Sequence, residues 1–291
     1  MTLRPLADAG RRVFRSLLNL VLVVLLGGFA AAALVRYSPG FDVDENSWNP
    51  RISADTLAAL HARHEQANQL LPFYLHYLRA AAQGDFGQSD SYRVPVSELL
   101  HDRAPVSAKL IGWGVAGGLS FGLALAWLSV WPRRAVLSIA TASVSGLLLA
   151  IPSAVLALAF FFAEAPLSIA VALTILPRVF GTLRALLEEL YSSSALLAAR
   201  ARGIPPWVLG IRYVLRPAAP QLMAVAGVAF VLAFGSIIPI EALCDVPGIG
   251  QLAWKAALSR DLPLLSGLAL IITFVVAFVQ MTGDLLAGER N

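Results

Sequence analysis

The sequence predicts an all-α polytopic membrane protein with six transmembrane helices in one transmembrane domain and both termini in the cytoplasm. The 291 residues are 58% hydrophobic and only 14% charged, with a mean hydropathy of +0.72. A soluble domain carries about 25% charged residues. Six segments are apolar over about the 20 residues that a membrane-spanning helix needs. The arginines of the short connections fall on one side of these segments, as the positive-inside rule requires.

Composition also excludes several function classes. The net charge of +4 is spread between apolar segments rather than along one polar face, so no nucleic-acid partner is expected. The lysines Lys109 and Lys255 follow Ala108 and Trp254, so the sequence contains no G-x-x-x-x-G-K-[ST] phosphate loop. Any ATP that the protein uses must therefore bind to another chain. The single cysteine, Cys244, excludes an intrachain disulfide bond.

The first predicted span covers residues 14–35, after a cytoplasmic N-terminus of residues 1–13. Arginines precede this apolar run and the small residues Ala30–Ala33 lie near its end, as in a secretory signal peptide. Because the run is long for a signal peptide, we predict an uncleaved helix.

Residues 36–106 form a predicted external, helical segment. Apolar residues recur at helical spacing between Leu57 and Leu78 without a run of membrane length. Gly84–Gly87 predicts a turn, and Val94–Arg103 a short amphipathic helix that leads into the next span. His61 and His64 lie at i, i+3 with few further ligand types nearby, so surface histidines are expected rather than a metal site.

The second, third and fourth predicted spans cover residues 107–131, 136–162 and 166–185, and only Ala163–Ala165 separates the last two. In the second span Gly114, Gly118 and Gly122 recur every four residues, which predicts a stripe for close helix packing. The same residues surround Ser120 in a G-x-S-x-G pattern, which leaves an intramembrane serine hydrolase as an alternative. That motif needs a strand-to-helix turn and a nearby base, whereas all four histidines lie in residues 36–106.

Polar and helix-breaking residues within the spans are candidates for a translocation pathway, because ionisable residues at membrane depth are costly. Arg178 either lines a polar seam or extends its guanidinium to the cytoplasmic headgroups. Prolines leave a backbone carbonyl without its helical donor and either line a pathway or bend the helix. Glu241 and Asp284 lie near span ends and are expected to reach water. The candidate pathway residues are Pro152, Arg178, Ser236 and Pro239.

A cytoplasmic loop over residues 186–218 carries the strongest signal. Ala195–Arg202 is a strong helix former, Gly203 provides a left-handed stop, and Pro205 or Pro206 suits the first turn of a second helix. An interfacial helix that holds lipid phosphates is the alternative. It explains the arginines but not the Gly-x-Pro-Pro break. The fifth span, an external hairpin and the sixth span follow at 219–241, 242–263 and 264–286.

Four stretches resemble a known family. Ala198-Ala199-Arg200-Ala201-Arg202-Gly203, with Leu215 twelve residues after the glycine, resembles the "EAA" loop of ABC importer permeases. Gly84-Asp85-Phe86-Gly87-Gln88-Ser89 and the hairpin residues 246–252 and 259–263 are similar to segments of the B-type permeases for dipeptides, oligopeptides and nickel. The chain departs from that family in its short Ala163–Ala165 connection, in the lack of a basic C-terminal tail, and at Pro217 and Pro220.

The resemblance implies a type I ABC importer permease fold in the bacterial inner membrane. It implies a transport subunit, not an enzyme, that moves a peptide-like or related small solute by ATP-driven alternating access. A second homologous permease, two ATPase subunits, an extracytoplasmic solute-binding protein and membrane lipid would be its partners. ATP and Mg²⁺ would bind to the ATPase subunits, and this chain would bind no cofactor. An ATP-independent channel or structural subunit remains the alternative.

The resemblance also implies two contact sites. Residues of the loop would couple the permease to an ATPase subunit, and residues of the hairpin would meet the solute-binding protein. The coupling residues are Ala198, Ala199, Arg200, Ala201, Arg202, Gly203, Ile204, Pro205 and Trp207. The hairpin residues are Pro247, Gly248, Gly250 and Asp261.

Overall fold

A computed structural model of the chain describes residues 4–36, 70–130 and 135–288, and these fold into helices joined by short connections. Within these residues, five helices are long and apolar enough to cross a membrane, and the bent pair α5–α6 makes a sixth span if it counts as one. The predicted all-α membrane class is therefore confirmed. The helices are α1 (Arg4–Arg36), α3 (Leu70–Ala81), α4 (Val96–Val130), α5 (Ala135–Ala150), α6 (Ser153–Phe162), α7 (Leu167–Ser192), α8 (Ser194–Ala201), α9 (Pro206–Val208), the π-helix η2 (Leu209–Leu215), α10 (Arg216–Leu243), α11 (Ile249–Leu258) and α12 (Leu262–Gly288).

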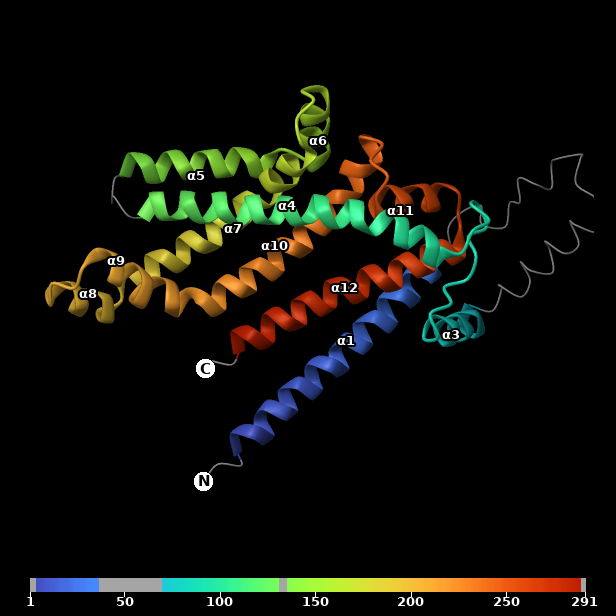
Figure 1. Cartoon of the computed structure of the whole chain (residues 1–291), viewed down its shortest axis with the longest axis horizontal. Coiled ribbons are helices and arrows are strands. Elements are labelled where there is room, and N and C mark those ends of the chain that lie inside the picture. Colours follow the sequence, from blue (N-terminus) through green and yellow to red (C-terminus); the bar gives the residue numbers. More distant parts are fainter. Residues whose placement is uncertain (1–3, 37–69, 131–134, 289–291) are drawn as a thin grey trace, which may run out of the picture.

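The long helices form an elongated array with two distinct ends. Figure 1 shows α8 and α9 at the same end of the array as the N- and C-termini, while α3 and α11 lie at the opposite end. Helices α1 and α12 run alongside each other, as do α4 and α5. The loop and the hairpin that the sequence singled out therefore occupy opposite ends of the molecule.

Helices α4 and α7 make the most extensive helix–helix contact among the described residues, and the glycine stripe allows them to approach closely. A Cβ atom added at Gly114, Gly118 or Gly122 would lie 2.4–2.6 Å from side-chain atoms of α7, namely those of Val171, Ile175 and Val179. The predicted packing stripe is confirmed. Ser120 is exposed in the middle of α4. The strand-to-helix turn that a serine nucleophile needs is therefore not present at Ser120.

The third predicted span is the clearest departure from the sequence-based prediction. Residues 136–162 do not form one straight helix, because α5 and α6 meet at an angle of 93°. Pro152, which has the extended angles φ −60° and ψ 143°, stands at the break. Proline cannot donate the helical hydrogen bond and biases its preceding residue away from helix. Pro177 lies buried inside a continuous α7, where packing against α4 and α10 maintains the helix.

Other helix boundaries also differ from the prediction. The amphipathic helix expected over Val94–Arg103 and the second span are one continuous helix, α4, which contains Pro105. The first helix begins at Arg4 rather than at residue 14. Of the helical pattern between Leu57 and Leu78, the part from Leu70 onward forms α3. His61 and His64 lie outside the described residues.

Helix α3 connects α1 to the start of α12 through two tyrosines. The Tyr74 hydroxyl donates to the Leu25 carbonyl in α1 at 2.7 Å. The Tyr77 hydroxyl lies 3.3 Å from both the Phe86 and the Pro263 carbonyl oxygens. Burial raises the pKa of Tyr77, so this hydroxyl stays protonated and able to donate.

Candidate functional site

A buried carboxylate organises the hairpin end of the molecule. Glu241, near the C-terminal end of α10, is fully buried. Its Oε1 accepts a hydrogen bond from the Ser107 hydroxyl of α4 at 2.7 Å, and its Oε2 accepts from the backbone N–H groups of Gly250 (2.6 Å) and Gln251 (3.3 Å). The Ser107 oxygen in turn accepts from the Ile249 N–H at 2.8 Å. One carboxylate thus joins α4, α10 and α11, and the expectation that Glu241 reaches water is wrong.

Two glycines allow the hairpin backbone to approach this carboxylate. A Cβ atom at Gly248 would lie 2.3 Å from the Glu241 carboxyl carbon. A Cβ atom at Gly250 would lie 2.7 Å from the Ile238 Cα and 3.0 Å from the Ile237 carbonyl oxygen. These glycines are therefore required by close approach to α10.

A second buried carboxylate, that of Asp261, fixes the end of the hairpin between α11 and α12. Asp261 precedes α12, and its Oδ1 accepts from the Leu264 N–H at 3.0 Å, which caps the helix. Its Oδ2 accepts from the Ser89 hydroxyl (2.5 Å) and the Ser91 N–H (3.0 Å). Asp261 therefore holds the segment after α3 against the start of α12.

The geometry corrects the expected role of three hairpin residues. Gly248, Gly250 and Asp261 are buried and cannot themselves touch a partner, whereas Pro247 is exposed. Burial follows from the polar contacts with Glu241 and Ser89, which place these residues on the inner side of the hairpin. Gly248, Gly250 and Asp261 therefore hold the hairpin surface in position but do not form part of that surface.

The loop at the opposite end begins with a capped helix and ends with the predicted break. The Ser193 hydroxyl accepts from the Leu196 N–H at 3.4 Å at the start of α8. Gly203 has φ +73°, and Pro206 is the first residue of α9. The left-handed stop and the restart at proline are both as the sequence predicts. The π-helix η2 then leads directly into α10.

Not all the predicted coupling residues face outward. Ala199 is 1% exposed and packs with Leu196 into the main core, so it cannot offer a surface to another protein. Ile204 is half-buried. The predicted coupling residues that are exposed are Ala198, Arg200, Ala201, Arg202, Gly203, Pro205 and Trp207.

Arg200 takes part in an aromatic stack within the chain. Its guanidinium carbon lies 5.3 Å from the centre of the Tyr191 ring, a cation–π arrangement. The Tyr191 ring meets Trp127 of α4 edge-to-face with 6.3 Å between centroids. The stack connects α8, α7 and α4, so Arg200 has an internal partner besides any external one.

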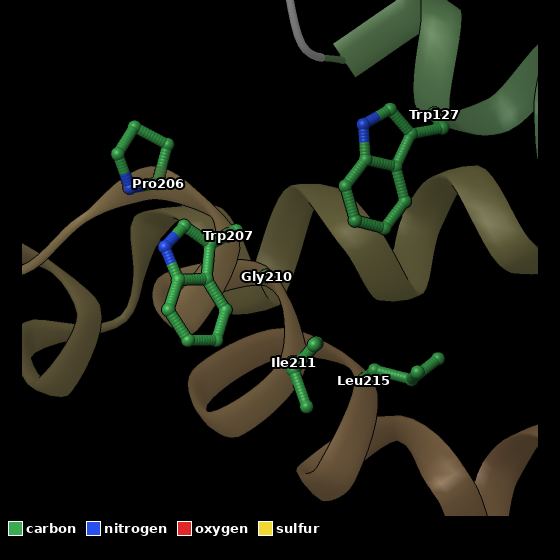
Figure 2. A pocket seen from close by; sticks show the side chains of 6 residues that line it. All are labelled: Trp127, Pro206, Trp207, Gly210, Ile211 and Leu215. Carbon is green, nitrogen blue, oxygen red and sulfur yellow. The ribbon is translucent and has the colours of Figure 1, made fainter.

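An apolar pocket lies beside this stack. Figure 2 shows Trp127 of α4 on one side, and Trp207, Ile211 and Leu215 on the other. Its volume is about 290 Å³, and Pro206 and Gly210 complete its lining. Trp207 is 70% exposed and Ile211 58% exposed. Trp127 is not among the residues predicted from the sequence, because its closeness to the loop depends on how α4 packs.

The predicted pathway residues have different environments. Pro152 is exposed at the α5–α6 bend, and Arg178 is exposed on α7. Pro239 is half-buried within α10. Ser236 is buried, and its hydroxyl donates to the Ala233 carbonyl at 2.8 Å, so it has no open surface within this chain. The Asp284 side chain lies outside what the structure describes.

Among the described residues, no group of three or more His, Cys, Asp or Glu side chains is placed to hold a metal ion. The two buried carboxylates accept hydrogen bonds from protein groups and thus serve structural purposes.

Comparisons with known proteins found a matching family and relatives that align with nearly the whole chain. Residues 118–288 match the model of the family described as "Binding-protein-dependent transport system inner membrane component". The "Oligopeptide transport system permease protein OppB" of Escherichia coli (strain K12) is 27% identical over 285 residues, which cover 90% of each protein. The "Nickel import system permease protein NikB" of Staphylococcus aureus (strain NCTC 8325 / PS 47) is 24% identical over 291 residues, which cover 93% of this chain and 87% of NikB.

Proposed function

Because the chain belongs to the family of binding-protein-dependent transport system inner membrane components, we propose that it forms the translocation pathway for a peptide-like or related small solute by ATP-driven alternating access. It is a multi-pass inner-membrane permease component of an ABC importer and not an enzyme. The observation that carries the proposal is the match over residues 118–288, which includes both the loop and the hairpin. The family match also disfavours the serine hydrolase alternative.

The family implies that other chains complete the transporter. We propose a second homologous permease, two ATPase subunits that bind ATP and Mg²⁺, and a solute-binding protein. The end with α8, α9 and the two termini would face the cytoplasm, and the end with α11 would face the binding protein. The absence of a phosphate loop from the sequence supports the placement of ATP on a partner.

The exposed part of the loop is the proposed contact with an ATPase subunit. Ala198 and Ala201 are small enough to allow close approach, Arg202 can meet acidic or carbonyl groups, and Gly203 provides the turn. Trp207 and the apolar pocket beside it offer a surface for a partner's side chain. Arg200, through its contact with the Tyr191 ring, and Ala199, through its packing in the main core, would hold this surface in place.

Copurification tests the proposal. The complex is isolated from membranes through a tag on this chain, and its ATPase subunits and ATP hydrolysis are measured. Ala201→Trp adds bulk at the exposed end of α8 and should remove most of the ATPase from the complex. Ala257→Trp makes the same change at an exposed position of α11 and should retain it.

The alternatives make different predictions for the same material. A wild-type complex that contains no ATPase subunit would contradict the proposal. Solute flux through sealed vesicles without nucleotide would favour the ATP-independent channel instead.

A further inference from the structure

The exposed face of α7 differs from that of a helix that contacts lipid tails. Arg178, Gly181, Thr182 and Ala185 are exposed, and their spacing places them on one side of the helix. An added Cβ at Gly181 would meet no atom within 4 Å, so the surface there is open. We refer to these four residues as the α7 polar face.

Large apolar side chains are missing from this part of α7. Along the described chain between Ile169 and Leu197, no large hydrophobic side chain is exposed. By contrast, the exposed faces of α1 and α5 carry large apolar side chains, as is expected of helices that contact lipid tails. Those faces carry Phe14, Leu17, Leu18, Val21, Leu22, Val136, Ile139, Val144, Leu147 and Leu149.

Arg178 lies far from both ends of its helix. At 1.5 Å per residue it is about 16 Å from Leu167 and about 21 Å from Ser192. Arg184, six residues nearer the loop, is paired with Glu188 at 2.8 Å and donates to the Ser138 hydroxyl at 2.8 Å. Within the described residues, the Arg178 guanidinium has no such hydrogen bond or ion pair.

Extension of Arg178 to the headgroups does not account for its neighbours. That explanation places one charge at the membrane surface but leaves Gly181, Thr182 and Ala185 against lipid tails. An aqueous passage accounts for all four residues, because water solvates the charge and does not need large apolar side chains.

We propose that the α7 polar face lines the aqueous pathway of the transporter and that Arg178 attracts an anionic group of the solute. This inference rests on the proposed function and assigns a chemical class to its solute. A guanidinium binds carboxylates in bidentate fashion and repels a bare divalent cation. Of the substrates named for the two relatives, a peptide with a free carboxylate fits Arg178 and free Ni²⁺ does not.

Cysteine modification in the complete transporter tests the pathway. Thr182→Cys lies one helical turn from Arg178, and Leu147→Cys on α5 is the lipid-facing control. Methanethiosulfonate reagents react with thiolates in water, so Thr182→Cys should react at least about tenfold faster than Leu147→Cys. The native Cys244 is buried, and the wild-type chain gives the background rate. Equal rates at the two positions, both without nucleotide and with ATP, would overturn the proposal.

The charge of the reagent tests the role of Arg178. In the Thr182→Cys background, the rate ratio of the negatively charged to the positively charged reagent should fall about five- to tenfold with Arg178→Gln. Arg178→Lys should preserve the ratio. A ratio that Arg178→Gln leaves unchanged would overturn the anion site, while ATPase copurification separately reports whether the proposed function holds.

Ion uptake tests the assigned class of solute. In vesicles that contain the complex and its binding protein, free Ni²⁺ should not accumulate with ATP. ATP-dependent accumulation of free Ni²⁺ would overturn the assignment.

Discussion

At the hairpin end, the carboxylates of Glu241 and Asp261 accept hydrogen bonds from the buried donors around them, whereas at the loop end Trp207 and Ile211 are exposed around an open apolar pocket. Buried polar groups that have partners make a region rigid and self-sufficient. Exposed large apolar groups around a pocket indicate a surface that another molecule covers. The difference indicates that internal polar contacts hold the hairpin end together, while the loop end offers an open apolar pocket to another molecule.

The strongest test of this difference is Glu241→Leu. It should lower the free energy of unfolding by about 3 kcal/mol or more, since three buried donors lose their acceptor at about 1–3 kcal/mol each. Unfolding by SDS titration in micelles, followed by tryptophan fluorescence, measures the change. Glu241→Gln keeps an acceptor oxygen and should cost less. A loss under about 1 kcal/mol for Glu241→Leu would show that water reaches these donors.

Gly250→Ala should produce the next largest effect at the hairpin end. The added methyl would lie 2.7 Å from the Ile238 Cα, so backbone must shift. A loss of about 2 kcal/mol is expected, within the usual cost of overpacking. Gly235→Ala is the control, because a Cβ there meets nothing within 4 Å. If both variants unfold at the same SDS concentration, the hairpin is not tightly packed against α10.

Arg200→Ala should have a smaller effect at the loop end. Loss of the cation–π contact with Tyr191 should cost about 0.5–1 kcal/mol. Arg202→Ala, for which no such ring contact is described, should change the free energy of unfolding by less than about 0.5 kcal/mol. Equal effects of the two substitutions in the same titration would argue against a structural role for the aromatic stack.

Of these substitutions, Trp207→Ala should change the free energy of unfolding least and the copurification of ATPase subunits most. Because Trp207 is 70% exposed, the free energy of unfolding should stay within about 0.5 kcal/mol of wild type. Copurification of the ATPase subunits should fall severalfold. Trp254→Ala removes a tryptophan that is 52% exposed on α11 and should leave copurification intact. Similar loss of ATPase in both variants would remove the functional contrast between the two ends.

Features that depend on local sequence were predictable. The stop at Gly203, the restart at Pro206 and the glycine stripe of α4 follow from backbone sterics and from helical spacing, so the sequence alone indicates them. The membrane class follows from the composition of the chain, which is likewise known from the sequence alone. These predictions need no knowledge of which helices become neighbours.

Features that depend on tertiary packing were not predictable. Glu241 is buried because α4 brings Ser107 to it and the hairpin folds back over it, and neither event leaves a local signal. Ala199 faces the core because α8 packs against the main core, and the sequence around Ala199 predicts a helix without showing which of its faces is buried. A proline in an apolar run likewise does not indicate whether neighbouring helices hold the run straight, as at Pro177, or leave it bent, as at Pro152.

The pairing of α1 with α12 has a consequence for biosynthesis. Gly27 and Gly28 of α1 lie against Thr273 and Leu270, so the first of the described helices packs against the last of them. At a synthesis rate of about 5–20 residues per second, α1 waits for tens of seconds in the bilayer before α12 emerges. During that time the α12-facing surface of α1 must be covered by lipid or by the insertion machinery. The contact between α1 and α12 can therefore form only after α12 has been synthesised, later than the insertion of the helices between them.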